Sequence, residues 1–428
     1  MKATYLALLL FLVLTAIGIP ISVSMMLGAI IAVVVFGVYP PISLATLFYS
    51  SLDSHLLVAI PLFMLSGLVI SYGGIARCIF DFSESLLGFL PGSLGSVNVM
   101  ASMIFGGISG SSVADVAGIG AIGIKEMVHR NYPRPYSTAI TVAASTLAVI
   151  VPPSILMIIY ATSANISVGA ALASGLIPGL FVALVLIAVN TVFAIRKKWA
   201  PSMDFSIRRV VRTAAYGFPA LLAPIIILGG IFMGFFTPTE SSAIAFLYCL
   251  FIGTFVYREL DAKKLYQVIY EGGRTTGIVA FELASGLLFA NLMTIEGIPG
   301  MLTRAFVGLH SDPWQVILVI NIILLAAGMF LNPGFSIIVL TPLLLPIAKS
   351  AGYHPIHFGI IMVTNLAIGL IIPPGGACLY IGSVVSGLPI EKLVRALLPF
   401  YVVLLLALVV IILTPAMSIG FVEWLYRD

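Results

Sequence analysis

The residue types best suited to chemistry form a glycine- and serine-rich run, GGISGSS (106–112), inside a strongly apolar segment. Glycines there permit a tight turn, and serine hydroxyls with freed backbone carbonyls are the hard oxygen ligands that a small alkali cation prefers. An isolated run of small residues would more often serve close helix packing in a membrane. A matching stretch in the second half of the chain favours cation binding here.

Two Pro-Pro pairs, at 152–153 and 373–374, lie 221 residues apart in apolar segments. Because proline lacks an N–H, each pair leaves backbone carbonyls one turn earlier without their helical partners. The carbonyls concerned are those of Ala148, Val149, Gly369 and Leu370. Half-helix ends at membrane depth also carry partial charge, so that carbonyl ends suit a cation and N-terminal ends suit an anion.

The same offset of 221 residues aligns much of the chain with itself. FGGISGSSVAD (105–115) corresponds to AGMFLNPGFS (327–336), and a looser match at an offset of 218 pairs GIP (18–20) with FTP (236–238). Duplicated membrane chains with helix breakers in corresponding positions are typical of secondary transporters, whose substrates and ions bind at the breaks. The repeat therefore predicts a transporter.

Composition restricts the class of protein. Of the 428 residues, 61% are hydrophobic and 8% are charged, with a mean hydropathy of +1.19, and a soluble domain could not bury so much apolar surface. Ten apolar segments are expected to cross the membrane as helices; they are 3–19, 21–38, 56–76, 136–163, 171–195, 214–235, 240–257, 275–294, 357–386 and 396–416. We predict an all-α polytopic membrane protein, whose start is its first membrane helix rather than a cleaved signal peptide.

Two further segments, 94–124 and 314–348, are too long for one crossing and have their helix breakers near the middle. We interpret both as re-entrant hairpins. With the first hairpin opening to the cytoplasm, 16 of the 20 Lys and Arg residues lie on the cytoplasmic side, as the positive-inside rule requires. Both termini are then periplasmic, in a multi-pass protein of the bacterial inner membrane.

Each half of the chain then contains five crossings and one hairpin. Because five is odd, the second half enters the membrane upside down, which makes an inverted repeat of about 220 residues. The expected units are a first repeat, 1–200, with hairpin 94–124 and broken helix 136–163, and a second repeat, 201–428, with hairpin 314–348 and broken helix 357–386. The amphipathic stretches 201–213 and 258–272 are expected to be interfacial helices.

Three carboxylates are expected at membrane depth, where ionisable side chains are functional candidates. Asp115 follows the first hairpin tip closely enough to influence a cation site. Glu240 is better explained as part of a helix N-cap with a threonine of TPTESS, and Glu282 receives no role. HPIH (354–357) lacks Cys or acidic partners for a metal and is expected in an outer interfacial loop.

An intramembrane serine hydrolase is an alternative from another class, because GISG (107–110) places Ser109 in the GxSG pattern of rhomboid-type proteases. That chemistry needs a base within hydrogen-bond reach of the serine, and no histidine is expected inside a membrane helix. The sequence also contains no G-x-x-x-x-G-K-[ST] loop. The energy for transport is therefore expected from an ion gradient or a partner.

Several stretches together resemble the large membrane subunit of tripartite ATP-independent periplasmic (TRAP) transporters: FGGISGSSVADVAGIGAIGIKEM, VIVPPSILMIIY, FFTPTESSAIA, LTPLLLPIAKSAGYHPIHFGIIMVTNLAIGLIIPP and VRALLPF. The resemblance runs from about residue 5 to residue 417. It implies a non-enzymatic secondary transporter, usually sodium-coupled, that takes up organic acids such as C4-dicarboxylates or sialic acid. It also implies a transport domain that moves against a scaffold domain as an elevator.

The resemblance implies two protein partners, a small four-helix membrane subunit and a periplasmic substrate-binding protein, and no nucleic acid. The resemblance also implies that the selecting contacts lie largely on the binding protein, and no Lys or Arg in the membrane segments is placed to fix a carboxylate. A self-sufficient sodium/dicarboxylate symporter of similar inverted design is the nearest alternative.

Carried over onto this sequence, the resemblance implies sodium sites at the two hairpin tips and the two breaks. The candidate Na+ ligands are Ser109, Gly110, Ser111, Ser112, Pro152, Gly328, Asn332, Gly334, Thr364, Gly369 and Pro373. The candidate substrate contacts are Ser109, Ser154, Asn332, Asn365 and Gly375. Two departures concern the second site: Asn332 stands where relatives often have an acid, and Ile372 where many have a threonine.

Overall fold

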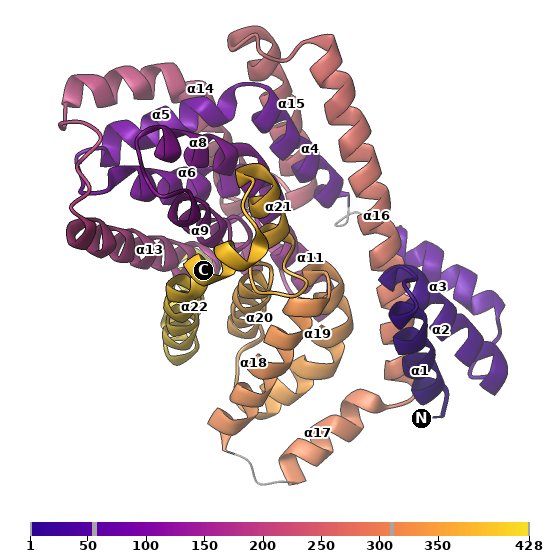
Figure 1. Ribbon diagram of the computed structural model, residues 1–428. Coiled ribbons are helices and arrows are strands. Elements are labelled where there is room, and N and C mark those ends of the chain that lie inside the picture. Colours follow the sequence, from indigo (N-terminus) through magenta and orange to yellow (C-terminus); the bar gives the residue numbers. More distant parts are fainter. Residues whose placement is uncertain (1, 54–57, 309–311, 427–428) are drawn as a thin grey trace.

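The computed structural model describes residues 2–53, 58–308 and 312–426, and this part of the chain is helical throughout, with no β-strand (Figure 1). The all-α prediction is confirmed. Residues 56–57 of the third predicted segment and Arg427, which was expected on the periplasmic side, lie outside the described residues.

The first half consists of short and medium-length helices. In chain order they are α1 (Lys2–Ala16), α2 (Ile21–Phe36), α3 (Ile42–Leu52), α4 (Ala59–Tyr72), α5 (Ile75–Leu87), α6 (Ser93–Ser109), α7 (Ser112–Asp115), the π-helix η1 (Val116–Gly120), α8 (Ala121–His129), α9 (Arg134–Ala144), α10 (Leu147–Ile150), α11 (Ile155–Ala164), α12 (Val168–Ala173) and α13 (Leu176–Lys197).

The second half contains the longest helices. They are α14 (Ile207–Phe232), α15 (Pro238–Phe251), the π-helix η2 (Ile252–Val256), α16 (Ala262–Ile295), α17 (Ile298–Gly308), α18 (Pro313–Phe330), α19 (Pro333–Ser350), α20 (Pro355–Gly369), α21 (Ala377–Ser386), α22 (Ile390–Leu413) and α23 (Ala416–Leu425).

The helix bounds of the two halves follow the offset seen in the sequence. Shifted by 221 residues, the continuous helical arm from Ser112 to His129 (α7, η1 and α8) has the same ends as α19. The preceding arm, α6, corresponds in the same way to α18, and α5 to α17. We call α6 to α8 the first hairpin and α18 to α19 the second hairpin.

Helix length and composition identify eight helices able to cross a membrane among the described residues, or nine if the bent pair α4 and α5 counts as one span. Two of the eight, α18 and α19, are the arms of the second hairpin. The ten expected crossings include α1 and α2, of 15 and 16 residues, and the short pair α20 and α21, which fall below the 18 residues of that test.

Several boundaries differ from those expected. The stretches 258–272 and 275–294 form one helix, α16, of 34 residues, and α14 runs without interruption from Ile207 through the predicted interfacial stretch. Polar first turns therefore extend membrane helices instead of lying apart from them. The segment 56–76 ends at a bend of 72° between α4 and α5. The helices α3, α5, α17 and α23 were not expected.

The helices gather in two groups around α16 (Figure 1). On one side, α1, α2 and α3 pack on α16, with the Thr4 N–H donating to Glu296 Oε2 at 2.7 Å, while α4 packs against both α15 and α16. The other group contains the hairpins, the broken helices and α22. The two groups meet where α16 packs against α19 and where α4 packs against α6.

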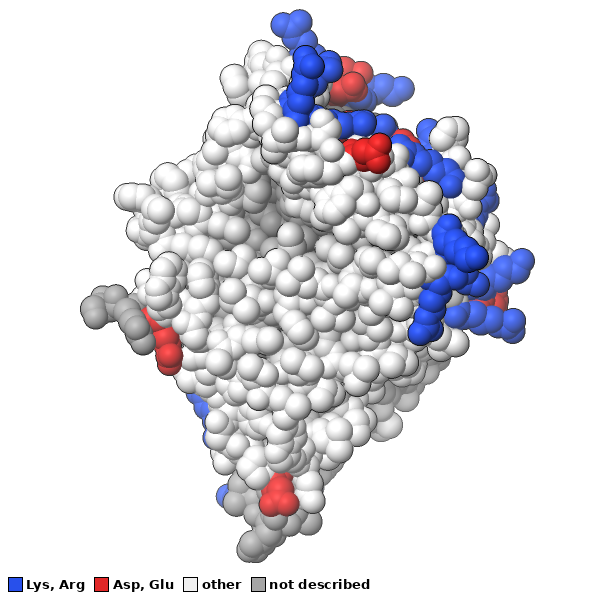
Figure 2. Space-filling view, turned by 90° about the vertical axis from the view of Figure 1, so that its left-hand side faces the viewer, with Lys and Arg blue, Asp and Glu red and all other residues white. Residues whose placement is uncertain are grey.

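On the face shown in Figure 2, charged side chains lie at the margins of the molecule. Lys and Arg gather along one rim of the face shown in Figure 2, above a broad band without charged side chains. The ends of α13 and the starts of α14 and α16 supply exposed basic residues, among them Arg196, Arg208 and Lys263. This is the distribution that the positive-inside rule expects of a membrane protein.

Accessibility labelling tests the placement of the hairpins in the membrane. Cys substituted for Trp314 and Lys349, which flank the second hairpin, should be labelled from one side of the membrane; Cys at Phe89 and His129, which flank the first, should be labelled from the other. All four positions are exposed, and the three native cysteines are buried. Labelling of Trp314→Cys and Lys349→Cys from different sides would contradict the re-entrant arrangement.

Candidate functional site

The tip of the first hairpin is a short turn between α6 and α7. Gly110 ends α6 with a φ of +61°, a left-handed conformation that favours glycine. Ser111 then caps α7, because its Oγ accepts a hydrogen bond from the Ala114 N–H at 3.3 Å. The Ser109 hydroxyl accepts from the Ser111 N–H at 3.4 Å.

The tip of the second hairpin is built around Asn332. Its Oδ1 accepts a hydrogen bond from the Gly334 N–H at 2.9 Å and so caps α19, which begins at Pro333. Proline suits the first position of a helix because its missing N–H would have no helical partner there. Asn332, which stands where relatives often have an acid, therefore still provides a capping oxygen but carries no formal charge.

Both predicted helix breaks are present. In the first break (151–154), Ser154 caps α11: its Oγ accepts from the Met157 N–H at 3.2 Å and donates to the Val149 carbonyl. In the second break (370–376), the Cys378 N–H donates to the Leu370 carbonyl at 3.0 Å, and the Ile372 N–H to the Gly369 carbonyl at 3.1 Å.

These bonds correct part of the prediction, since three of the four carbonyls expected to be freed already accept one hydrogen bond: those of Val149, Gly369 and Leu370. A carbonyl oxygen has two lone pairs. Each of the three therefore retains acceptor capacity for a cation, although none lacks a partner.

Glycines bring each hairpin into backbone contact with a broken helix. A Cβ on Gly369 would lie 2.6 Å from Gly328 Cα, and a Cβ on Gly106 would lie 2.5 Å from Ala148 Cα. Ala148 is the counterpart of Gly369 at the 221-residue offset. The same crossing of a hairpin arm over a broken helix thus occurs in both halves.

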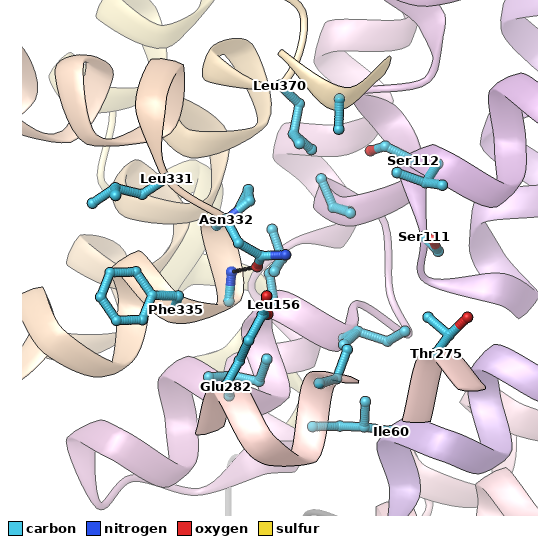
Figure 3. A pocket seen from close by; sticks show the side chains of 18 of the residues that line it. Ile60, Ser111, Ser112, Leu156, Thr275, Glu282, Leu331, Asn332, Phe335 and Leu370 are labelled. Atoms are coloured by element: carbon cyan, nitrogen blue, oxygen red, sulfur yellow. Dashed lines mark hydrogen bonds between the residues drawn. The ribbon is translucent and has the colours of Figure 1, made fainter. Parts of the chain in front are cut away.

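Both tips, the second break and the helical residues on either side of the first break line a cavity of about 370 Å³, bounded on its other side by α4 and α16 (Figure 3). The hairpin tips contribute two stretches, 110–113 and 330–335. The broken helices contribute Val149, Ile155, Leu156, Ile159, Leu370, Gly375 and Ala377, and the opposite wall contributes Ile60, Met64, Thr275, Val279, Glu282 and Leu283.

The wall formed by the hairpins and the broken helices presents the N-terminal ends of helical segments. The first residues of α11, α19 and α21 line the cavity, as does Ser112, where the continuous arm to His129 begins. Helix N-termini carry partial positive charge and unpaired N–H groups, which favour anions. No Lys or Arg is among the described lining residues, so the helix N-termini are the source of positive charge in this wall of the cavity.

The predicted site residues fall into two sets. Gly110, Ser111, Ser112, Asn332, Gly334 and Gly375 line the cavity. Ser109, Pro152, Ser154, Gly328, Thr364, Asn365, Gly369 and Pro373 do not line it; they belong to the hairpin ends, the breaks and α20 behind it. The structure thus brings both tips to one place and leaves the other candidates in a second layer.

Buried oxygens without hydrogen-bond partners among the described residues mark where a cation would fit. They include Ser112 Oγ beside the first tip, and Thr364 Oγ1 and Asn365 Oδ1 on α20. The Asn365 amide donates to the Asn321 carbonyl at 3.0 Å, which fixes its orientation. A buried oxygen left without a partner costs about 1–3 kcal/mol, and Na+ would supply the missing interaction. The donor set therefore fits a hard cation.

The three carboxylates differ in their surroundings. Glu240 forms the expected capping box, its Oε2 accepting from the Thr237 N–H at 2.8 Å, which confirms the capping prediction. Asp115 is fully buried beside the Ser102 hydroxyl and does not line the cavity. Glu282, which the sequence left without a role, does line it, together with Thr275.

The arrangement does not support a serine nucleophile at Ser109. His357 lies buried within α20, not in an outer loop as expected, and its ring nitrogens approach Ser418 Oγ at 3.1 Å and the Ile412 carbonyl at 3.3 Å. Both nitrogens are thus engaged with α23 and the end of α22. No base is provided to Ser109 by this histidine.

Comparison with known proteins agrees with this geometry. The family described as "Tripartite ATP-independent periplasmic transporter, DctM component" matches residues 8–417. A C4-dicarboxylate TRAP transporter large permease protein of Pseudomonas aeruginosa is 40% identical over 90% of both chains, and a sialic acid TRAP transporter large permease protein of Vibrio cholerae is 36% identical over 86% of both.

This chain belongs to the large-permease family of TRAP transporters. It is a multi-pass membrane transport protein and not an enzyme. The crystal structure of the YdaH transporter of Alcanivorax borkumensis is similar in fold, with a TM-score of 0.61 and 12% identity, over 89% of this chain and 87% of that one.

The contact between Gly369 and Gly328 provides a test of how the site is held together. In this TRAP permease, Gly369→Ala would place a methyl group 2.6 Å from backbone atoms, and such overpacking costs about 1–3 kcal/mol. We expect a lower unfolding temperature in detergent. Gly229→Ala in α14 is the matched control, because its added Cβ would meet nothing within 4 Å. Equal stability of the two variants would contradict the close crossing.

Proposed function

We propose that this TRAP large permease imports an organic acid anion of the C4-dicarboxylate or sialic acid type, driven by the Na+ gradient. The observation that carries the proposal is the cavity whose wall combines both hairpin tips with helix N-termini and contains no basic side chain. Helix N-termini suit the carboxylate of the substrate. Its relatives include permeases named for C4-dicarboxylates and for sialic acid.

Sodium coupling is supported by the chemistry of the oxygens around the cavity. Carbonyl, hydroxyl and amide oxygens gather near each tip and break, and Thr364 Oγ1 and Asn365 Oδ1 are buried without partners among the described residues. The candidate sites are those named from the sequence, with Ser154 and Ser112 in the first and Asn365 and Thr364 in the second. Bound cations would offset the charge of the entering anion and so couple the two.

An elevator mechanism is supported by the two groups of helices. The hairpins and broken helices supply one wall of the cavity, and α4 and α16 supply the other. Movement of the first group against the second would open the cavity to either side in turn, as alternating access requires. The repeats proposed at 1–200 and 201–428 would each supply one tip and one break to the moving group.

Two partners complete the proposal: a periplasmic binding protein that delivers the substrate, and a small membrane subunit. The group formed by α1, α2, α3 and α16 exposes many large apolar side chains, among them Tyr5, Leu9 and Val35. Such a surface fits lipid and a membrane partner. Two relatives are named TRAP transporter permease proteins and not large permease proteins. Both are longer than this chain, which covers 64% and 67% of their lengths. The protein would lie in the inner membrane with both termini periplasmic.

Removal of the Ser154 hydroxyl tests the first sodium site. Its Oγ accepts one hydrogen bond and donates another, which leaves one lone pair for a cation. Loss of one such interaction costs about 1 kcal/mol, so Ser154→Ala should raise the Na+ concentration for half-maximal uptake about fivefold. Ser109→Ala, in the adjoining tip, should act in the same direction.

Ser167→Ala is the matched control for Ser154→Ala. Ser167 also caps a helix, accepting from the Ala170 N–H at 3.3 Å, but it lies at the start of α12, outside both hairpin tips and both breaks. It should lose similar stability and keep the sodium dependence of uptake. Unchanged sodium dependence in both Ser109→Ala and Ser154→Ala would contradict the proposed site.

Reconstitution separates the proposal from its alternative, a self-sufficient symporter. Liposomes that contain this chain and the small subunit should accumulate labelled sialic acid or succinate when an inward Na+ gradient and the binding protein are both present. Omission of either should reduce uptake at least tenfold. Sodium-driven uptake that needs no binding protein would favour the self-sufficient symporter, and uptake without a Na+ gradient would contradict coupling.

A further inference from the structure

Glu282 is the one charged side chain among the described residues that line the cavity. It extends from α16 toward the Asn332 tip (Figure 3). No described residue forms an ion pair or a hydrogen bond with its carboxylate. A carboxylate at membrane depth without a partner is costly, so the ligand that enters the cavity is the natural source of compensation.

The α16 wall offers hydrogen-bond acceptors. Glu282 can only accept when ionised. Thr275, the other polar side chain of α16 in the cavity wall, donates its hydroxyl proton to the Glu271 carbonyl at 2.8 Å, which leaves only its lone pairs for a ligand. A substrate group that faces α16 must therefore donate.

The opposite wall offers donors. Ser111 Oγ already accepts from the Ala114 N–H, so its own proton is available. Asn332 Oδ1 accepts from the Gly334 N–H, so the NH2 group of the same amide points away from that N–H and can donate to a ligand (Figure 3). Together with the helix N-termini, these groups suit a carboxylate.

We infer that the permease itself, and not only its binding protein, selects an organic acid with one carboxylate and with hydroxyl or ammonium donors at its other end. The carboxylate would face the hairpin tips and the helix N-termini, and the donors would face Glu282 and Thr275. A second carboxylate beside Glu282 would be repelled. This inference rests on the proposed transport function and narrows its substrate class.

Direct binding tests this polarity. The purified chain in lipid nanodiscs with NaCl is titrated with D-gluconate, 4-aminobutyrate and succinate, which carry hydroxyls, an ammonium group and a second carboxylate respectively. At least one of the first two should bind about tenfold more tightly than succinate, as expected for a like-charge contact with Glu282. Comparison of D-gluconate with 4-aminobutyrate identifies which donor the site prefers.

Variants at two positions of α16 assign the effect. Glu282→Gln should reduce the preference over succinate about tenfold, and Glu282→Asp should retain part of it. Glu271→Gln is the matched control, because Glu271 lies on the same helix but accepts from the Tyr72 hydroxyl at 3.0 Å, away from the cavity. This control should keep the preference of the unmodified chain.

Three outcomes would overturn the inference: tighter binding of succinate by the unmodified chain, an unchanged preference in Glu282→Gln, or a loss of sodium dependence in that variant without a change in preference. The last would make Glu282 a cation ligand. Sodium-dependent binding in which succinate is the tightest ligand would overturn only this inference. If no acid bound and Na+ had no effect, the proposed transport function would fail with it.

Discussion

The structure depends on the requirement that every backbone N–H and C=O at membrane depth finds a partner within the protein. The tips and breaks interrupt helices where water cannot compensate. Ser111, Ser154 and Asn332 each cap the helix that follows an interruption, and the Gly369 and Leu370 carbonyls accept hydrogen bonds from N–H groups of the second break and of α21. Each interruption thus finds its partners within its own segment, and close glycine contacts such as that of Gly369 with Gly328 pack the hairpins against the broken helices around one cavity.

Much of this site could be predicted from the sequence because its signals are local. Proline lacks a donor and glycine tolerates close approach, so the breaks at 151–154 and 370–376 and the two tips lie where expected. The capping box at Glu240 is equally local, since its partners are three residues apart. The 221-residue offset further predicted that the tips correspond, and the helix bounds follow it.

The residues that the sequence left unplaced depend on contacts between distant segments. Glu282 has no local signal, because its role follows from α16 packing against the second hairpin. The merging of 258–272 with 275–294 into α16 has a similar cause. A polar first turn predicts an end to a membrane helix, yet α4 packs against the first turns of α16, where the Tyr72 hydroxyl donates to Glu271, and supports a helix that continues past them. His357 likewise lies buried because Ser418 and the Ile412 carbonyl, far along the chain, receive its ring nitrogens.

The two hairpin tips have corresponding helix ends but carry different polar groups, and the two walls of the cavity differ in charge. The first tip provides the Ser111 and Ser112 hydroxyls, whereas the second provides one amide at Asn332, with no formal charge. The cavity's negative charge is then carried by Glu282 on the facing wall. A carboxylate on a hairpin tip would travel with the site through an elevator cycle, but one on α16 would meet the site only while the two groups of helices face each other as they do here. Under the proposed elevator movement, an acid bound at the tips would have its donor groups beside Glu282 in one position of the cycle and be separated from Glu282 in the other. If the hairpins move as proposed, a charge on α16 would therefore act on the bound substrate in one position of the cycle only, whereas a charge on the tip would act on it throughout.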